Sequence, residues 1–270
     1  MTHFNRHFSG RWSSVAALLL SALILAIAVS EPASAHPEDD FCEAGAEIDP
    51  ELCRKLAAAN SGDARAYSPL LDDDGAVRSP LDTALMYTDI GVRHILPGGA
   101  DHILFVLALF LASERLRSLI IQISAFTVAH TVTLGLAGAG FINPPAAIVE
   151  PLIALSIAFV AAENLLLREM SAWRPLVVFG FGLFHGLGFA GFVRDVGLPP
   201  GQFWSSLIGF NLGVEIGQLA VVAAALLIRQ PLKLALARVG ATYRAAIVAP
   251  ASALIAAIGL WWAITRALGI

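Results

Sequence analysis

The stretch His94-Ile95-Leu96-Pro97-Gly98-Gly99-Ala100-Asp101-His102 places two imidazoles and a carboxylate just before an apolar run that extends from Ile103 to Ala112. Ionisable groups are costly in hydrocarbon, so they usually face a protein interior and mark an ion path. Histidine nitrogen and aspartate oxygen together suit a borderline divalent metal. The alternative is a polar helix end at the lipid headgroups, in which Asp101 caps a helix that begins at His102.

Pro97, Gly98 and Gly99 predict a break inside this stretch. Proline removes a helix hydrogen bond, and glycine tolerates non-helical dihedral angles. In an unbroken helix His94 and Asp101 would stand about 10 Å apart along the axis, too far to bind one ion. Either the break folds His94 back onto Asp101 and His102, or His94 is an outer relay.

The composition indicates an all-α polytopic membrane protein, because 57% of the residues are hydrophobic, 14% are charged and the mean hydropathy is +0.73. The chain has no basic, aromatic-rich stretch that would indicate nucleic-acid binding. It has no nucleotide-binding loop that would indicate transport driven directly by ATP. Residues 93–270 are expected to form the transmembrane domain, with a helix from Ser79-Pro80 leading into it. Each apolar segment reaches the about 17–25 residues that cross a bilayer. The six predicted spans are 95–113, 118–138, 146–167, 175–193, 203–228 and 245–265.

The chain before these spans has two expected parts. Residues 1–35 are typical of a cleavable signal peptide, with an uncleaved anchor helix as the alternative. Residues 36–92 carry thirteen acidic and four basic side chains, a net charge of −9, and are expected to be periplasmic. Their cysteines, Cys42 and Cys53, are the only two in the chain and most simply form a disulfide.

Basic residues lie after alternate spans, which predicts the orientation. Connections after the first, third and fifth spans hold seven of the eight arginines that lie between spans, so they are expected in the cytoplasm. The acidic segment is then periplasmic and the protein resides in the bacterial inner membrane. The last span lacks charge, which suggests a supporting role. The arginines and lysine concerned are Arg115, Arg117, Arg168, Arg174, Arg229, Lys233, Arg238 and Arg244.

Several polar side chains are predicted to share one depth in the membrane. Depth is measured at about 1.5 Å per residue from the nearest cytoplasmic arginine. One group of five residues, which we call the central set, lies about 17–21 Å from it. Two further residues, Glu150 and Asn211, lie about 27 Å away, and Glu163 about 8 Å. Packing or an interhelical hydrogen-bond seam is the alternative for each of these groups. The central set comprises Asp101, His102, His130, His185 and Glu215.

These residues resemble the HupE/UreJ family, most closely its second subfamily, over roughly residues 90–230. The resemblance rests on His94…Asp101-His102, the Phe-Thr-Val-Ala-His stretch ending at His130, Glu150, Glu163-Asn164-Leu165, Phe184-His185-Gly186, and Gly209-Phe210-Asn211…Glu215. Members of the family are regarded as nickel or cobalt permeases, so the resemblance implies a transporter and not an enzyme.

The expected function is inward movement of a divalent transition metal, which is the substrate and not a fixed cofactor. The central set and His94 are the expected ligands. Glu150 and Asn211 would line the approach, and Glu163 would assist release. Nickel or cobalt is favoured, zinc and copper(II) stay open, and copper(I) is disfavoured because thiolates or thioethers suit it better.

Two other functions remain as alternatives. One is a membrane-embedded zinc hydrolase, assisted by Ser156 or Glu150. The other is a metal sensor or assembly scaffold that does not transport. The expected partners are the lipid bilayer and the metal ion, with a second copy of the chain or a metal-delivery protein as open alternatives.

Overall fold

The structure, a computed structural model, describes residues 78–113, 115–167, 173–189 and 200–270. The predicted signal peptide, most of the acidic segment, Cys42 and Cys53 lie outside these residues. The described chain is helical throughout, as predicted. Its α-helices are α3 (Pro80–Ile95), α4 (Ala100–Ala112), α5 (Leu116–Gly138), α6 (Ala146–Leu166), α7 (Arg174–Gly188), α9 (Phe203–Arg238) and α10 (Ala249–Leu268). A 3-10 turn, η1 (Pro200–Gln202), precedes α9, and a π-helical turn, η2 (Arg244–Val248), leads into α10.

Four described helices are long and apolar enough to cross a membrane: α5, α6, α9, and η2 continued by α10. A fifth span exists if the bent pair α3 and α4 is counted as one. The expectation of six spans is therefore met only in part. The predicted span 175–193 corresponds to α7, which ends at Gly188, and residues 190–199 lie outside the described chain.

The break predicted at Pro97, Gly98 and Gly99 is confirmed. Helix α3 begins where expected, with the Ser79 side chain capping it by accepting a hydrogen bond from the Asp82 backbone N–H at 3.1 Å. It ends at Ile95, and α4 begins at Ala100 after a bend of 73°. At about 1.5 Å per residue, the 13 residues of α4 extend about 20 Å, which is less than a bilayer.

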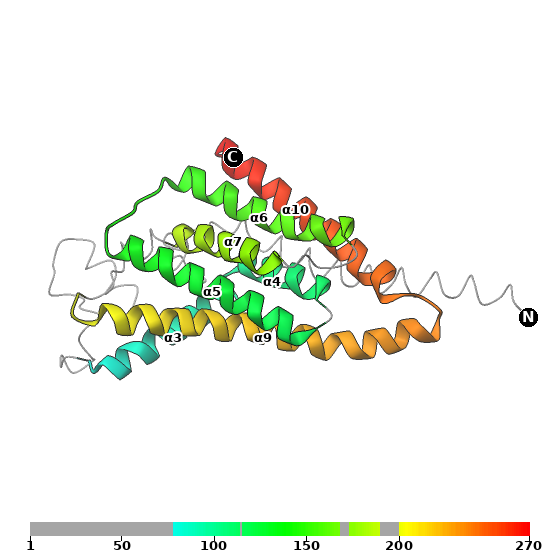
Figure 1. Cartoon of the computed structure of the whole chain (residues 1–270), viewed down its shortest axis with the longest axis horizontal. Coiled ribbons are helices and arrows are strands. Elements are labelled where there is room, and N and C mark those ends of the chain that lie inside the picture. Colours follow the sequence, from blue (N-terminus) through cyan, green and yellow to red (C-terminus); the bar gives the residue numbers. More distant parts are fainter. Residues whose placement is uncertain (1–77, 114, 168–172, 190–199) are drawn as a thin grey trace, which may run out of the picture.

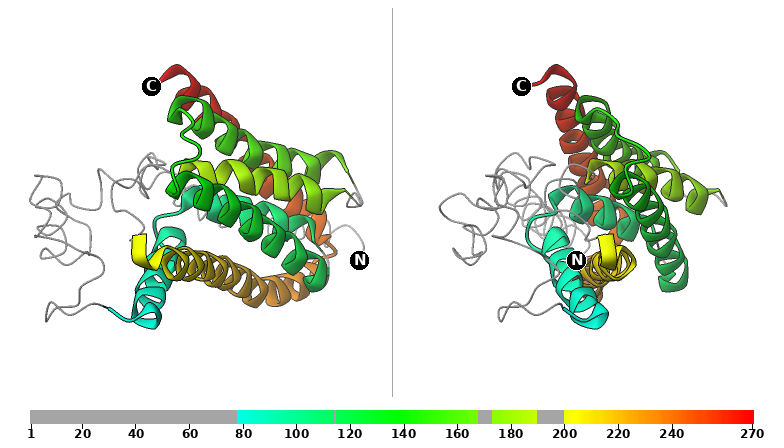
Figure 2. Two further views of the ribbon diagram at one scale, coloured as in Figure 1. Left: turned by 60° about the vertical axis from the view of Figure 1, so that its left-hand side comes forward. Right: turned by 90° about the vertical axis from the view of Figure 1, so that its left-hand side faces the viewer.

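Helix α4 lies among the other helices, which pair side by side: α3 with α9, α5 with α7, and α6 with α10 (Figures 1 and 2). Small residues let the first two pairs approach closely. A Cβ atom at Gly213 of α9 would collide with the Thr88 carbonyl of α3, and one at Gly186 of α7 would collide with the His130 carbonyl of α5. Backbones this close place the side chains of neighbouring helices in direct contact.

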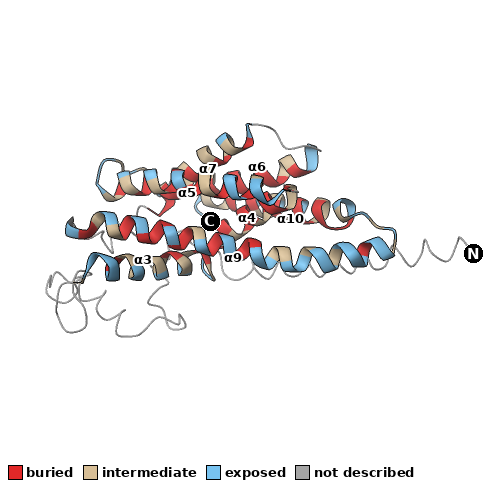
Figure 3. Cartoon of the chain, turned by 60° about the horizontal axis from the view of Figure 1, so that its bottom comes forward, coloured by how far each residue is buried: buried red, intermediate tan, exposed pale blue. Residues whose placement is uncertain are grey.

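Burial follows the faces where the helices meet, and the second half of α9 is largely exposed (Figure 3). Arginines mark one end of the bundle. Arg244 donates to the carbonyls of Asn164 and Leu167, so the end of α6 lies beside the start of η2. Arg229 of α9 donates to the carbonyl of Ser113, so the end of α4 lies beside α9. We call this end, where α5 and α7 also begin, the basic end.

Candidate metal site

Three histidines from three helices meet in the bundle. His94 is in the last turn of α3, His102 in the first turns of α4, and His130 in α5. One ring nitrogen from each lies within 4.8 Å of the other two. We call this group the histidine trio. The break after Ile95 brings His94 to His102, with ring centroids 4.9 Å apart. His94 is therefore folded back onto His102, which is the first of the two arrangements that the sequence left open.

The trio has nitrogen atoms that are buried and without a partner. Nε2 of His94, of His102 and of His130 each lacks a hydrogen bond. Buried polar atoms are almost always satisfied, so three such atoms in one place suit a shared partner, either an ion or ordered water. Neutral imidazole is a good ligand for nickel, cobalt, zinc and copper(II).

Asn211 fixes which nitrogen of His130 carries the proton. The Asn211 Nδ2 atom donates to the Leu207 carbonyl at 2.8 Å, so its Oδ1 atom faces His130. Oδ1 is only an acceptor and lies 2.9 Å from Nδ1 of His130, which must therefore donate. In the neutral ring, Nε2 of His130 is then unprotonated and free to bind a metal. Asn211, expected on the outer approach, lies directly against the trio.

His185 of α7 is close to the trio and is held by Ser156 of α6. The Ser156 hydroxyl donates to the Ile153 carbonyl at 2.6 Å, so towards His185 Nε2, at 3.0 Å, its oxygen can only accept. Nε2 of His185 is thus protonated, and its Nδ1 atom, buried and without a hydrogen bond, carries the lone pair. His185 and His102 have ring centroids 5.0 Å apart.

Asp101 is held by a residue that the sequence did not single out. Arg266, near the end of α10, donates to both carboxylate oxygens at 3.1 and 3.2 Å, and both side chains are about 10% exposed. The last predicted span, 245–265, was expected to lack charge and to play a supporting role. Arg266 is the residue directly after it, so it was not among the predicted site residues. A carboxylate already paired on both oxygens stays only a predicted ligand.

The remaining predicted residues are spread along the bundle. Glu215 of α9 is half-buried and accepts a hydrogen bond from Ser124 of α5 at 2.7 Å. Glu150 lies in the first turns of α6 and is half-buried. Both stay predictions as pathway or ligand residues, since neither belongs to the trio.

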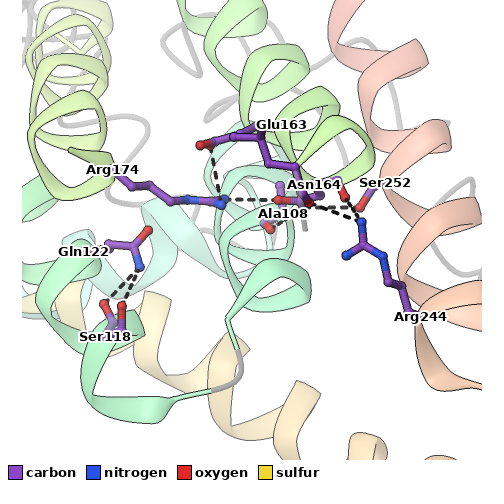
Figure 4. Close-up of polar contacts among 9 residues, drawn as sticks. Ala108, Ser118, Gln122, Glu163, Asn164, Arg174, Arg244 and Ser252 are labelled. Atoms are coloured by element: carbon purple, nitrogen blue, oxygen red, sulfur yellow. Dashed lines mark hydrogen bonds and ion pairs between the residues drawn. The ribbon is translucent and has the colours of Figure 1, made fainter. Parts of the chain in front are cut away.

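Glu163 lies at the basic end, in a polar network that joins four helices (Figure 4). Its carboxylate pairs with Arg174 of α7 at 3.4 Å. The neighbouring Asn164 donates to the Ala108 carbonyl of α4 at 2.8 Å and to the Ser252 hydroxyl of α10 at 3.2 Å, and accepts from Arg174 at 3.2 Å. This network fixes α4, α6, α7 and α10 relative to one another at the end opposite Asp101.

The fold and the trio define a helical membrane protein with a buried cluster of three imidazoles. Residues 72–266 match the family model described as HupE / UreJ protein, and because this is well over half of the chain, the chain belongs to the HupE/UreJ family. The match confirms the resemblance and extends it on both sides. The family is generally associated with nickel and cobalt transport and not with catalysis. No curated protein and no solved structure matches the chain.

Proposed function

We propose that this chain carries a divalent transition metal inward across the bacterial inner membrane, with nickel or cobalt as the preferred cargo. The observation that carries the proposal is the histidine trio, with one buried and unpaired Nε2 atom on each ring. The family's general association with metal transport supports it.

The donor set suits reversible binding in a transporter. Three neutral imidazoles form bonds to a divalent ion without neutralising its charge. They therefore hold the ion less tightly than a set of thiolates would. His94 is half-buried whereas His102 and His130 are buried, so the approach is expected from the side of His94. With the basic end in the cytoplasm, as the positive-inside rule requires, the ion enters from the periplasm.

The hydrolase alternative has less support in the site. Ser156 is engaged by the Ile153 carbonyl and by His185, so its hydroxyl proton is already donated. Glu150 does not belong to the trio, and a metal-activated water would need a base beside it.

Purified protein in liposomes tests the proposal with a panel of nickel, cobalt, zinc and copper(II). We expect saturable uptake and one bound metal per chain at equilibrium. The variant His130→Gln should lose both. Gln218→Leu is the matched control, because Gln218 is equally buried and bonds Thr127 at 3.3 Å without touching the trio.

Thermal or denaturant unfolding gives an independent measure. A ligand that binds only the folded state at about 100 times its Kd adds about 2.7 kcal/mol of stability. The wild type and Gln218→Leu should gain this increment, and His130→Gln should lose it. Binding without uptake would instead support the scaffold alternative, and absence of both would contradict the metal site.

A further inference from the structure

His185 lies on the basic side of the trio. Its ring contacts Phe105 of α4 and Phe126 of α5, with centroid distances of 5.2 and 4.9 Å. Phe105 is about one turn beyond His102 along α4, and Phe126 about one turn before His130 along α5, so both are nearer the basic end. 

His94 lies on the opposite side of His102. Its ring contacts Phe189, which follows α7, and Phe210 of α9, at 4.2 and 5.5 Å. Phe189 is about one turn beyond His185 on the side away from the basic end. The order along the bundle, towards the basic end, is therefore His94, His102, His185.

The spacing of the rings suits two successive metal positions. With metal–nitrogen bonds of about 2 Å, two imidazoles on one tetrahedral ion have ring centres about 5 Å apart. His94 and His102 are separated by 4.9 Å, and His102 and His185 by 5.0 Å. His130 lies 5.9 Å from His102 and 6.5 Å from His94, so its ring needs to approach by about 1–1.5 Å for the same geometry.

We propose that the metal moves between two positions that share His102: an outer position made by the trio, and an inner position made by His102 and His185. This inference rests on the proposed transport function and gives it a direction. Nδ1 of His185 is the receiving atom, because Ser156 keeps the proton on Nε2 and leaves Nδ1 unprotonated and unpaired.

In the transfer step the ion keeps its bond to His102. The bonds to His94 and His130 break and one bond to Nδ1 of His185 forms, while water fills the remaining coordination positions. A position with two protein ligands holds the ion more weakly than one with three. Such a weaker second site favours release, since conduction needs binding that is neither too tight nor confined to one place.

The experiment separates binding from movement in the full-length protein, with nickel as the probe. We expect His185→Leu to bind one nickel with a Kd close to that of the wild type but to lose uptake. His130→Gln should lose both, because removing a ligand of the outer position costs affinity directly. If His185→Leu loses affinity as fully as His130→Gln, all four histidines form one site and the two-position scheme is wrong. If its uptake equals that of the wild type, the scheme is also wrong.

Ser156→Ala tests the same step if His185→Leu does not fold. Its nickel affinity should be unchanged while uptake falls about tenfold or more, the usual range for loss of a group that orients a ligand. Nitrogen-15 NMR of labelled histidine should show His185 protonated on Nε2 in the metal-free wild type and a mixture of tautomers in Ser156→Ala. A wild-type His185 protonated on Nδ1 would overturn the proposal. Failure of uptake in the wild type would instead contradict the transport function itself.

Discussion

Asn211 accepts a hydrogen bond from Nδ1 of His130 at 2.9 Å, across the contact between α9 and α5. Because its own amide nitrogen is bound to the Leu207 carbonyl at 2.8 Å, the orientation of the amide is fixed. This contact leaves Nε2 of His130 without a proton in the neutral ring and without a hydrogen bond. In the proposed site, Asn211 therefore sets the ability of His130 to bind the metal without touching the metal itself.

Replacing Asn211 tests this relationship. Asn211→Asp keeps an acceptor for Nδ1 of His130 and should retain nickel binding, whereas Asn211→Leu should weaken it by about 10–100-fold. Isothermal titration of both variants gives the affinities, with Gln218→Leu as the control on the same helix. Equal affinities for the Asp and Leu variants would show that Asn211 only packs against His130.

The Asp101–Arg266 pair should act as a unit. Arg266→Leu alone leaves a buried, uncompensated carboxylate and should cost about 3–5 kcal/mol. The double variant Asp101→Leu with Arg266→Leu should recover most of that loss, because it removes both charges together. Unfolding free energies of the two single variants and the double variant form the cycle. Additive losses would mean that the two charges do not depend on each other.

Gly213 should control the position of His94 through the contact of α9 with α3. Gly213→Ala places a methyl group against the Thr88 carbonyl and forces the helices apart, at a cost of about 1–3 kcal/mol. Nickel affinity should fall as well, since α3 carries His94. Gly180→Ala is the matched control, as a Cβ there meets no atom within 4 Å. An unfolding curve and a titration on each variant check both effects, and a Gly213→Ala protein as stable as the wild type would contradict them.

Glu163 is expected to assist release at the basic end. Glu163→Gln removes the ion pair with Arg174. Because Glu163 is at the basic end and not in the trio, nickel affinity should be unchanged while uptake slows. Uptake at saturating nickel and equilibrium binding separate the two effects. A normal uptake rate would leave Glu163 only a structural role in the network of Asn164.

Cys42 and Cys53 are expected to form a disulfide, a prediction from the sequence alone because both lie outside the described residues. Thiol labelling of freshly isolated protein should fail at both positions before reduction and succeed after it. Full labelling without reductant would show two free thiols.

Local backbone chemistry and long-range contacts determine different parts of this molecule. The bend between α3 and α4 was predictable because proline and glycine act on their own stretch of backbone. The depth of the histidines was also predictable in part, since the rise per residue fixes distance along an axis. The same rise per residue gave Glu215 and Asp101 the depth of the histidines. In the structure Glu215 bonds Ser124, and Asp101 bonds Arg266.

By itself the sequence determined that this is a helical membrane protein, where its chain breaks, and which polar side chains lie inside, because hydropathy and backbone chemistry are properties of each segment alone. Only the tertiary structure decided which of them meet. His94, His102 and His130 form the trio, and Asp101 pairs with Arg266, 165 residues away. The reason is that depth along a helix leaves its rotation and its neighbours open. Close contacts at small residues such as Gly186 and Gly213 fix both.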